Sequence, residues 1–145
     1  MLAGGAAFLF EYLDDSVKGP EIEQAFGVPV LANVVEVAED GLDPRRALLH
    51  HPKSAFSEAF QVLRTNLRYS LPENENGQSG MGRAFVVTSV EPAVGKTTTV
   101  DNLAIALART GQRVIIVDAD MRRPDLHKLW DIPNDTGLSS LLVGD

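Results

Sequence analysis

A segment in the second half of the chain has the residue types and spacing of a phosphate-binding loop. It reads Ser89-Val90-Glu91-Pro92-Ala93-Val94-Gly95-Lys96-Thr97-Thr98. Binding phosphate between a strand and a helix requires inward-pointing backbone N–H groups, a helix N-terminus, a compact residue, a cation and a hydroxyl for a metal ion. Gly95, Lys96 and Thr97 supply the last three features in that order. The segment therefore predicts a nucleotide site.

Each residue type has an expected role at such a site. Lys96 is expected to reach the β and γ phosphates of ATP, Thr97 to bind Mg²⁺ through its hydroxyl, and Thr98 to donate to a phosphate oxygen. The common motif G-x-x-x-x-G-K-S/T has glycine where this chain has Val90, so a plain helix start capped by threonine remains an alternative at this point. The remaining cofactor-binding positions in the loop are Pro92, Ala93, Val94 and Gly95.

Two carboxylates follow the next apolar run and, with Lys96, form the candidate catalytic set. Asp118 and Asp120 end the stretch Val114-Ile115-Ile116-Val117-Asp118-Ala119-Asp120. Mg²⁺ prefers hard oxygen ligands, and a carboxylate beside an incoming hydroxyl can accept its proton. Asp118 or Asp120 could therefore hold the water shell of the metal or act as a base. The alternative for either residue is an ordinary turn-forming aspartate.

An α/β unit is expected to bring these two segments together. Residues 84–89 and 113–118 are apolar runs typical of buried parallel strands, and Thr110 and Gly111 end the helix between them. A strand, helix and strand joined this closely predict a right-handed crossover with the ligand crevice at the carboxyl ends of the strands. The apolar positions of the helix are Val100, Leu103, Ala104 and Leu107.

A second long helix is predicted upstream. Ser54 can cap a helix that begins at Ala55. The neighbouring flank is typical of a solvated face, with contact to another subunit as the alternative, and it carries Gln61, Arg64 and Arg68. One stripe of the helix is formed by large apolar residues spaced at helical intervals: Phe56, Phe60, Leu63 and Leu67.

The segments that flank these helices are assigned from composition. Residues 21–26 predict a short helix closed by Gly27, and residues 28–37 an extended segment. Residues 39–53 have the glycine, proline and charge content of a connector, and residues 71–82 that of a mobile loop.

Two further features lie downstream of the carboxylates. Pro124 and Pro133 frame a short amphipathic piece that contains Leu126 and Trp130, and residues 137–143 predict the start of a helix. The histidines have no metal-ligand spacing and are interpreted as surface residues; they are His50, His51 and His127.

Composition restricts the partners and the compartment. The 145 residues carry a formal net charge of −7, which provides no broad basic surface, so nucleic acid is not expected as a partner. The absence of cysteine fits a reducing compartment such as the cytoplasm. The apolar residues 1–10 are shorter than the roughly 20 residues of a membrane span, so they are either the end of a membrane helix or a short buried start.

With these motifs in view, the chain resembles the bacterial tyrosine kinases of the CpsD/CapB type, the polysaccharide biosynthesis tyrosine autokinases. Their phosphate loop has the form S-x-x-P-x-x-G-K-S/T, in which the position of Val90 need not be glycine. The chain matches it at Ser89, Pro92, Gly95, Lys96 and Thr97. Their second motif, a strand ending in D-x-D with R-R-P behind it, is matched by Asp118, Asp120, Arg122, Arg123 and Pro124.

The resemblance implies both a fold and an activity. The fold is α/β, a P-loop NTPase of the SIMIBI or MinD-like class with a parallel sheet and flanking helices. The activity is phosphoryl transfer from Mg-ATP to a tyrosine hydroxyl, in the regulation of capsule and exopolysaccharide biosynthesis and export. Lys96 and the loop amides then stabilise the phosphates, Thr97 and Asp118 serve the metal, and Asp118 or Asp120 helps to accept the proton.

The first part of the chain resembles a different region of the same proteins. Residues 11–31 are similar to the stretch that follows the last membrane helix of a Wzz-like co-polymerase region. We therefore expect residues 1–37 to be the membrane-proximal end of that region, 38–53 a linker, and 54–145 the N-terminal part of the kinase domain. The full-length form is then expected at the cytoplasmic face of the cell membrane, with the co-polymerase region as a partner.

The chain departs from the family pattern in three places. The helix motif E-x-x-R-x-x-R, which implies packing between subunits in a ring, aligns with Glu58, Gln61 and Arg64, and the amide of Gln61 cannot form a bidentate ion pair, which weakens the case for self-association. Ala93 and Val94 stand where the family often has Gly-Glu. The Walker B aspartate and the C-terminal tyrosine cluster are missing, so we expect a sheet incomplete at the C-terminus and weak or absent kinase activity of the chain alone.

Two other functions share some of these motifs. A ParA or MinD-like partitioning ATPase has the D-x-D strand, but it carries an additional lysine early in a K-G-G-x-x-G-K-T loop, and residues 90–94 contain none. A non-enzymatic, membrane-proximal nucleotide-binding adaptor shares all the motifs of the kinase and differs only in whether another chain completes the site.

Overall fold

The computed structural model describes residues 26–35, 41–71 and 82–144 of the chain. The chain divides into two units, Met1–Asn33 and Val34–Asp145. In the described part of the first unit, Gly27 has a φ of +64°, the left-handed conformation that suits a glycine at a helix end. The helix predicted for residues 21–26 lies almost entirely outside the described residues, and residues 28–35 form neither helix nor strand.

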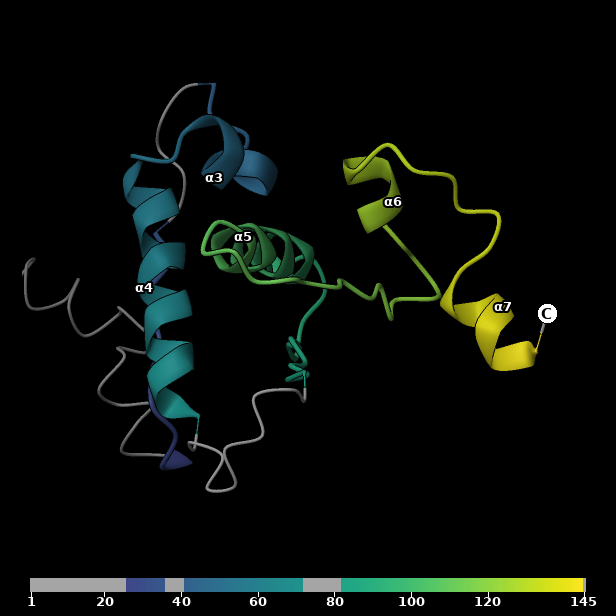
Figure 1. Cartoon of the computed structure of the whole chain (residues 1–145), viewed down its shortest axis with the longest axis horizontal. Helices are drawn as coiled ribbons and strands as arrows, with labels where there is room; N and C mark the ends of the chain where they lie inside the picture. The colour runs from purple at the N-terminus through teal and green to yellow at the C-terminus, as the bar shows by residue number, and fades with distance from the viewer. Residues whose placement is uncertain (1–25, 36–40, 72–81, 145) are drawn as a thin grey trace, which may run out of the picture. The chain divides into compact units, whose positions relative to one another are not determined.

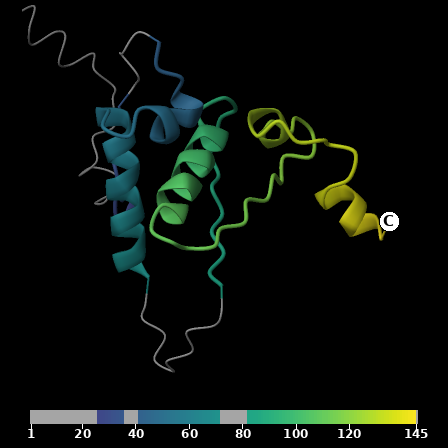
Figure 2. The same cartoon turned by 45° about the horizontal axis from the view of Figure 1, so that its top comes forward.

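Two helices form the centre of the unit Val34–Asp145. Helix α4 (Ala55–Ser70) packs against helix α5 (Lys96–Ala108), and both are contacted by the short helix α3 (Ala47–His50). The 3-10 helix η1 (Pro44–Arg46) precedes α3 directly and packs on α5. Figures 1 and 2 show α4 and α5 side by side, with α3 near one end of the pair.

Helix α4 confirms the prediction made from its cap and its apolar stripe. The side chain of Ser54 accepts a hydrogen bond from the backbone N–H of Ser57 at 3.2 Å, as an N-cap does. Phe56 and Phe60 are buried with their ring centroids 5.2 Å apart, and Leu63 packs against the same cluster. On the polar flank, Gln61 and Arg68 are exposed as predicted. Arg64 differs, because it is half-buried and donates from Nη1 to the carbonyl of Ala106 on α5 at 3.5 Å.

Helix α5 also forms where the sequence predicts it. Its N-cap is Gly95, and its C-terminal turn closes at Gly111 with a φ of +82°. The middle of the helix is entirely buried, including two polar residues, Asp101 and Asn102.

One buried cluster joins α3, α4 and α5. It is formed by residues of these three helices together with Leu42, which precedes η1: Leu42, Ala47, Leu48, Phe56, Phe60, Ile105 and Ala106. Residues 39–53 were assigned to a connector from their composition, but their described part supplies Leu42, Ala47 and Leu48 to this core. The reason is that the apolar residues of this segment are spaced for packing on α5, although glycine, proline and charged residues surround them.

The two predicted strands are not seen as strands in the described part of the chain. Residues 84–89 and 113–118 have no ladder of backbone hydrogen bonds to a neighbour there, and a strand exists only through such a ladder. Their apolar side chains are largely accessible, with Val86 90% and Ile115 89% exposed. The parallel sheet therefore remains a prediction.

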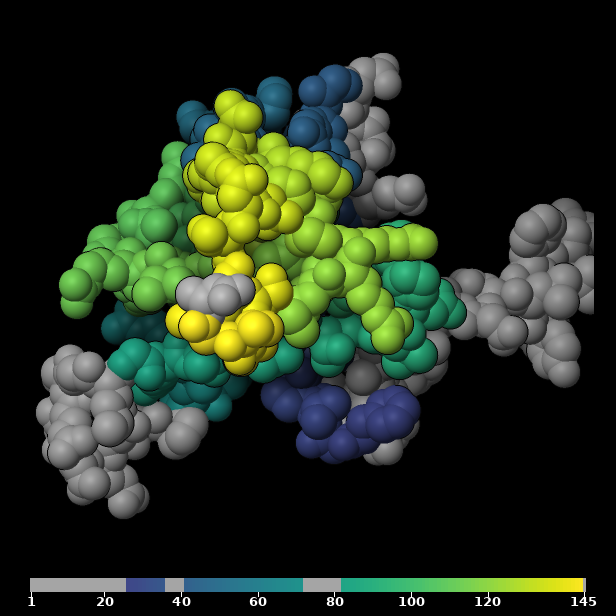
Figure 3. Space-filling view, turned by 90° about the vertical axis from the view of Figure 1, so that its right-hand side faces the viewer, coloured from purple at the N-terminus to yellow at the C-terminus, as the bar shows by residue number. Residues whose placement is uncertain are grey.

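Two short helices follow the second of these segments. Helix α6 (Leu126–Leu129) and helix α7 (Leu138–Val143) lie where the amphipathic piece and the later helix start were predicted. Leu141, Leu142 and Val143 of α7 are exposed, and this helix is drawn in yellow in Figure 3. The loop predicted for residues 71–82 lies outside the described residues except at its two ends. Among the helices that the structure describes, none is long and apolar enough to cross a membrane.

Candidate functional site

The phosphate loop is organised by its own side chains. Lys96, the first residue of α5, donates from Nζ to the hydroxyl of Ser89 at 2.9 Å and to the carbonyl of Glu91 at 3.2 Å. The hydroxyl of Ser89 in turn donates to the carbonyl of Glu91 at 2.6 Å. These bonds fold the loop back over the start of α5. They hold the ammonium group of Lys96 at the N-terminus of the helix, where the helix dipole also favours an anion.

Two residues of the loop have left-handed backbone conformations. Gly95 has a φ of +88°, and the space around its Cα is open, so it is the backbone angle rather than crowding that favours glycine here. Ala93 has a φ of +61°, which costs an L-residue on the order of 1 kcal/mol. Ala93 therefore stores strain at a position that glycine would fill without cost.

The hydroxyl side chains predicted for the metal and the phosphates sit in the first turn of α5. Thr97 and Thr98 are both half-buried. The carbonyl of Thr98 accepts a hydrogen bond from the side-chain amide of Asn102 at 2.9 Å, which ties this first turn to the buried part of the helix.

The carboxylates of the second motif are engaged with their own backbone. Asp118 accepts from the N–H of Asp120 on Oδ1 at 3.1 Å, and from those of Asp125 and Leu126 on Oδ2 at 3.0 and 3.2 Å. Asp120 accepts on Oδ1 from the N–H groups of Arg122 and Arg123 at 3.2 and 3.0 Å. Both residues thus shape turns, and Asp118 also fixes the start of α6.

The structure joins the two motifs indirectly. No hydrogen bond or ion pair links Lys96 to Asp118 or Asp120 among the residues it describes, and no group of three potential metal ligands occurs there. The connection runs instead between α6 and α5: the indole Nε1 of Trp130 donates to Oδ1 of Asp101 at 2.7 Å.

Asp101 is a buried acid in the middle of α5. Its side chain is completely buried, and Oδ2 has no hydrogen-bond partner in the described part of the chain. Burial raises the pKa of Asp101 above its ordinary value of 3.8, while the hydrogen bond from Trp130 and the charge of Arg46 act in the opposite direction. Neither Asp101 nor Trp130 was assigned a role from sequence. The signal available was a carboxylate within the apolar positions of a helix.

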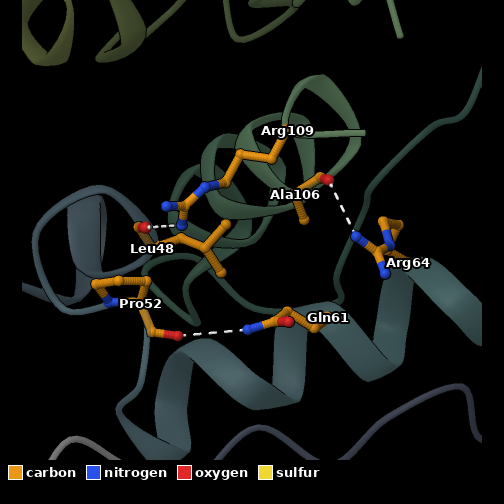
Figure 4. Close-up of a pocket in the computed structure, with 6 residues that line it drawn as sticks. All are labelled: Leu48, Pro52, Gln61, Arg64, Ala106 and Arg109. Carbon is orange, nitrogen blue, oxygen red and sulfur yellow. Dashed lines mark hydrogen bonds between the residues drawn. The ribbon is translucent and has the colours of Figure 1, made fainter. Parts of the chain in front are cut away.

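A separate hollow lies away from the phosphate loop. It has a volume of about 260 Å³ and is formed between α3, α4 and the end of α5. Gln61 donates to the carbonyl of Pro52 at 3.3 Å and Arg109 to that of Leu48 at 2.7 Å, so its polar groups are largely bonded within the chain (Figure 4). None of the predicted site residues lines it.

Comparison with known proteins identifies the nucleotide-binding part. Residues 85–141 match the family model of the CobQ/CobB/MinD/ParA nucleotide binding domain. This match covers the phosphate loop, α5 and the D-x-D segment, and it establishes a P-loop NTPase fold for this part of the chain.

Curated proteins that are similar to this chain include bacterial tyrosine-protein kinases. The chain is 38% identical over 92 residues to CapB of Staphylococcus aureus and 35% identical over 92 residues to the tyrosine-protein kinase YwqD of Bacillus subtilis. Each alignment covers 63% of this chain, but only 38% of CapB and 36% of YwqD. The chain thus spans little more than a third of the length of these relatives.

A solved structure supports the same assignment. The crystal structure of the chimerical protein CapA2B2 superposes with a TM-score of 0.69 at 32% sequence identity, over 87% of this chain and 50% of that chain. The chain is therefore similar to bacterial tyrosine-protein kinases, and residues 85–141 match a CobQ/CobB/MinD/ParA nucleotide binding domain.

Proposed function

We propose that this chain carries the ATP-binding part of a bacterial protein-tyrosine autokinase that regulates capsule or exopolysaccharide biosynthesis and export. The observation that carries the proposal is the loop around Lys96. Its ammonium group is held by Ser89 and Glu91 at the N-terminus of α5, next to a left-handed Gly95. A fixed cation, loop amides and a helix N-terminus together are what a polyphosphate requires.

The side chains present fit a magnesium nucleotide. Lys96 and the amides of Ala93 and Val94 would face the phosphates, with Pro92 shaping the turn and Thr98 as a further donor. Thr97 and Asp118 offer hard oxygen ligands of the kind Mg²⁺ prefers. When bound, Mg²⁺ neutralises charge on the transferred phosphate.

The chemical step is assigned to the protein's own groups. Lys96 stabilises negative charge on the phosphates, and Asp118 or Asp120 accepts the proton of the attacking tyrosine hydroxyl. Asp118 would have to exchange some of its three backbone hydrogen bonds for this role. Asp120 accepts backbone bonds through Oδ1 only, so its Oδ2 is the less engaged oxygen.

Three further parts of the proposal concern the whole kinase. Residues 84–89 and 113–118 would join a parallel sheet, in which flanking helices would cover their exposed apolar side chains. Self-association would use the α4 face that carries Glu58 and Arg64. The co-polymerase region, of which residues 1–37 would be the membrane-proximal end, would place the kinase at the cytoplasmic face of the cell membrane.

Calorimetric titration with ATP and with ADP, both in the presence of Mg²⁺, tests the nucleotide site. Lys96→Ala should lower the affinity at least about tenfold, because it removes the cation that faces the phosphates. Lys53→Ala is the matched control, since Lys53 is exposed and lies outside the loop.

Two results would contradict the proposal. Binding by the parent chain that is unchanged in Lys96→Ala would show that the loop is not the phosphate site. A parent chain that binds neither nucleotide would show that the loop does not function as a nucleotide site.

A further inference from the structure

Helix α6 is fixed to the rest of the protein at both of its ends. At its start, Oδ2 of Asp118 accepts the backbone N–H groups of Asp125 and Leu126. At its end, the indole N–H of Trp130 donates to Oδ1 of Asp101 at 2.7 Å. The first anchor belongs to the D-x-D motif, and the second to the helix that begins with Lys96.

The hydrogen bond between Trp130 and Asp101 joins residues that are 29 positions apart in the sequence, and only one of its two partners is buried. Asp101 has no exposed surface, whereas Trp130 is 41% exposed, so the ring lies at the surface with its N–H directed inward. Asp101 stands four residues after Thr97, one turn further along the same side of α5. The bond thus reaches the helix close to the predicted metal ligand.

Residues of η1 reinforce this anchor. The guanidinium of Arg46 lies 5.4 Å from the centroid of the Trp130 ring, within the range of a cation–π contact. Arg45 and Asp125 form an ion pair at 3.4 Å at the other end of α6. Since η1 itself packs on α5, these contacts also locate α6 relative to α5.

The short helix needs such anchors, because it is too short to define its own position. Isolated helices below roughly 12 residues are marginal in water, and α6 comprises Leu126–Leu129. Its place is therefore decided by the bonds at its ends. A hydrogen bond to a carboxylate is among the stronger kinds, and here it is shielded from water on the Asp101 side.

We propose that Trp130 and Asp101 are positioning residues of the nucleotide site: their hydrogen bond holds α6, and through α6 the carboxylate of Asp118, in place relative to the helix that carries Lys96 and Thr97. The inference rests on the proposed nucleotide site and adds to it two residues that touch neither phosphate nor metal. The predicted metal ligand Asp118 should therefore depend on the bond between Trp130 and Asp101. The phosphate loop around Lys96 should not depend on it.

Titration with ADP, with and without Mg²⁺, tests this separation on the full chain. Trp130→Phe keeps an aromatic ring, although a smaller one, and removes the donor, whereas Asp101→Ala removes the acceptor. Both should weaken ADP binding about tenfold in the presence of Mg²⁺ and leave Mg²⁺-free ADP binding close to that of the parent, since the loop around Lys96 is intact. Asp101→Asn keeps an acceptor oxygen and should stay within about twofold of the parent.

Matched controls remove the same chemical groups elsewhere. Tyr69→Phe deletes a polar atom from an exposed aromatic ring, and Asp135→Ala deletes an exposed carboxylate. Neither should change ADP affinity in either condition. Losses of equal size with and without Mg²⁺ in Trp130→Phe and Asp101→Ala would point to general destabilisation and overturn the positioning role, as would parent-like binding by both variants.

The bond itself has a readout that needs no nucleotide. Trp130 is the single tryptophan of the chain, so its indole N–H gives one resonance in a proton–nitrogen NMR spectrum. That proton should exchange slowly in the parent and in Asp101→Asn, and at least about tenfold faster in Asp101→Ala. Equal exchange in all three would refute the bond. A protected indole in a parent that binds no ADP would locate the failure in the proposed nucleotide site, and the positioning role would fall with it.

Discussion

Asp101 is a carboxyl group that the fold removes entirely from water. Its pKa is raised, with burial as the main cause, so the folded protein favours the protonated form more than the unfolded chain does. The contribution of this group to stability is therefore fully present below the ordinary pKa of 3.8 and is lost as the pH rises through the higher pKa of the folded state. At pH values above the pKa of the folded state, Asp101 causes no further change in stability.

Asp101→Asn should reveal this dependence, because asparagine keeps the acceptor for Trp130 and carries no charge at any pH. We expect the free energy of unfolding of the variant, relative to the parent, to increase as the pH rises from 3.8 and then to level off. Urea denaturation at a series of pH values measures it. Asp135→Asn, at an exposed site, should run parallel to the parent. A pH-independent difference for Asp101→Asn would disprove the raised pKa.

A buried amide on helix α5 makes several hydrogen bonds to the segment before α4. Oδ1 of Asn102 accepts the backbone N–H of Leu48 at 3.1 Å, and Nδ2 donates to the carbonyls of Pro44 and Arg45 at 2.8 and 3.3 Å. The side chain has no exposed surface. These bonds satisfy the backbone of η1 and α3 where that backbone meets the core, which explains how a segment rich in charged residues is packed so closely.

Asn102→Ala should therefore be strongly destabilising. It leaves the buried N–H of Leu48 and the carbonyl of Pro44 without their partner, and each such loss costs roughly 1–3 kcal/mol. We expect a decrease of about 3 kcal/mol in the free energy of unfolding, measured by equilibrium denaturation with urea. Asn134→Ala, at an exposed position, should change it by less than about 0.5 kcal/mol. A similarly small effect at Asn102 would mean that η1 and α3 do not depend on this amide.

For the unit Val34–Asp145 as a whole, ligand binding should be visible as stability. Among the described residues, the buried core is formed by Leu42 and by residues of α3, α4 and α5, while residues 84–89 and 113–118 expose apolar side chains. A ligand that binds only the folded state raises its stability by about 2.7 kcal/mol at a concentration one hundred times its Kd. For a chain of this size that corresponds to a rise in Tm of several degrees.

Thr97→Val tests whether Mg²⁺ contributes to this rise through the Thr97 hydroxyl. The substitution keeps the side-chain shape and deletes the predicted metal ligand. In a thermal unfolding experiment with ADP, we expect the additional increase in Tm on adding Mg²⁺ to be lost in Thr97→Val, while the increase caused by ADP alone remains. Thr110→Val, in the exposed turn that follows the same helix, serves as the control. A magnesium increment that survives in Thr97→Val would remove this residue from the metal site.

The two long helices and their ends were determined by local sequence. Ser54 caps α4, Phe56 and Phe60 fall on its buried side, and Gly95 takes the left-handed conformation that starts α5. The motifs around Lys96 and Asp118 also indicated the tyrosine-protein kinases to which the chain is similar. These features depend on hydrogen bonds and side-chain spacing within one or two turns, which is the information that a local pattern contains.

Only the tertiary structure decided how the segments are joined. The bond from Trp130 to Asp101 and the bonds from Asn102 to η1 and α3 connect positions between 29 and 58 residues apart. For this reason the composition of residues 39–53 indicated a connector, and the two polar residues in the middle of α5 received no role. A buried polar group is stable only when a partner meets it, and a pattern read along one helix does not contain that partner.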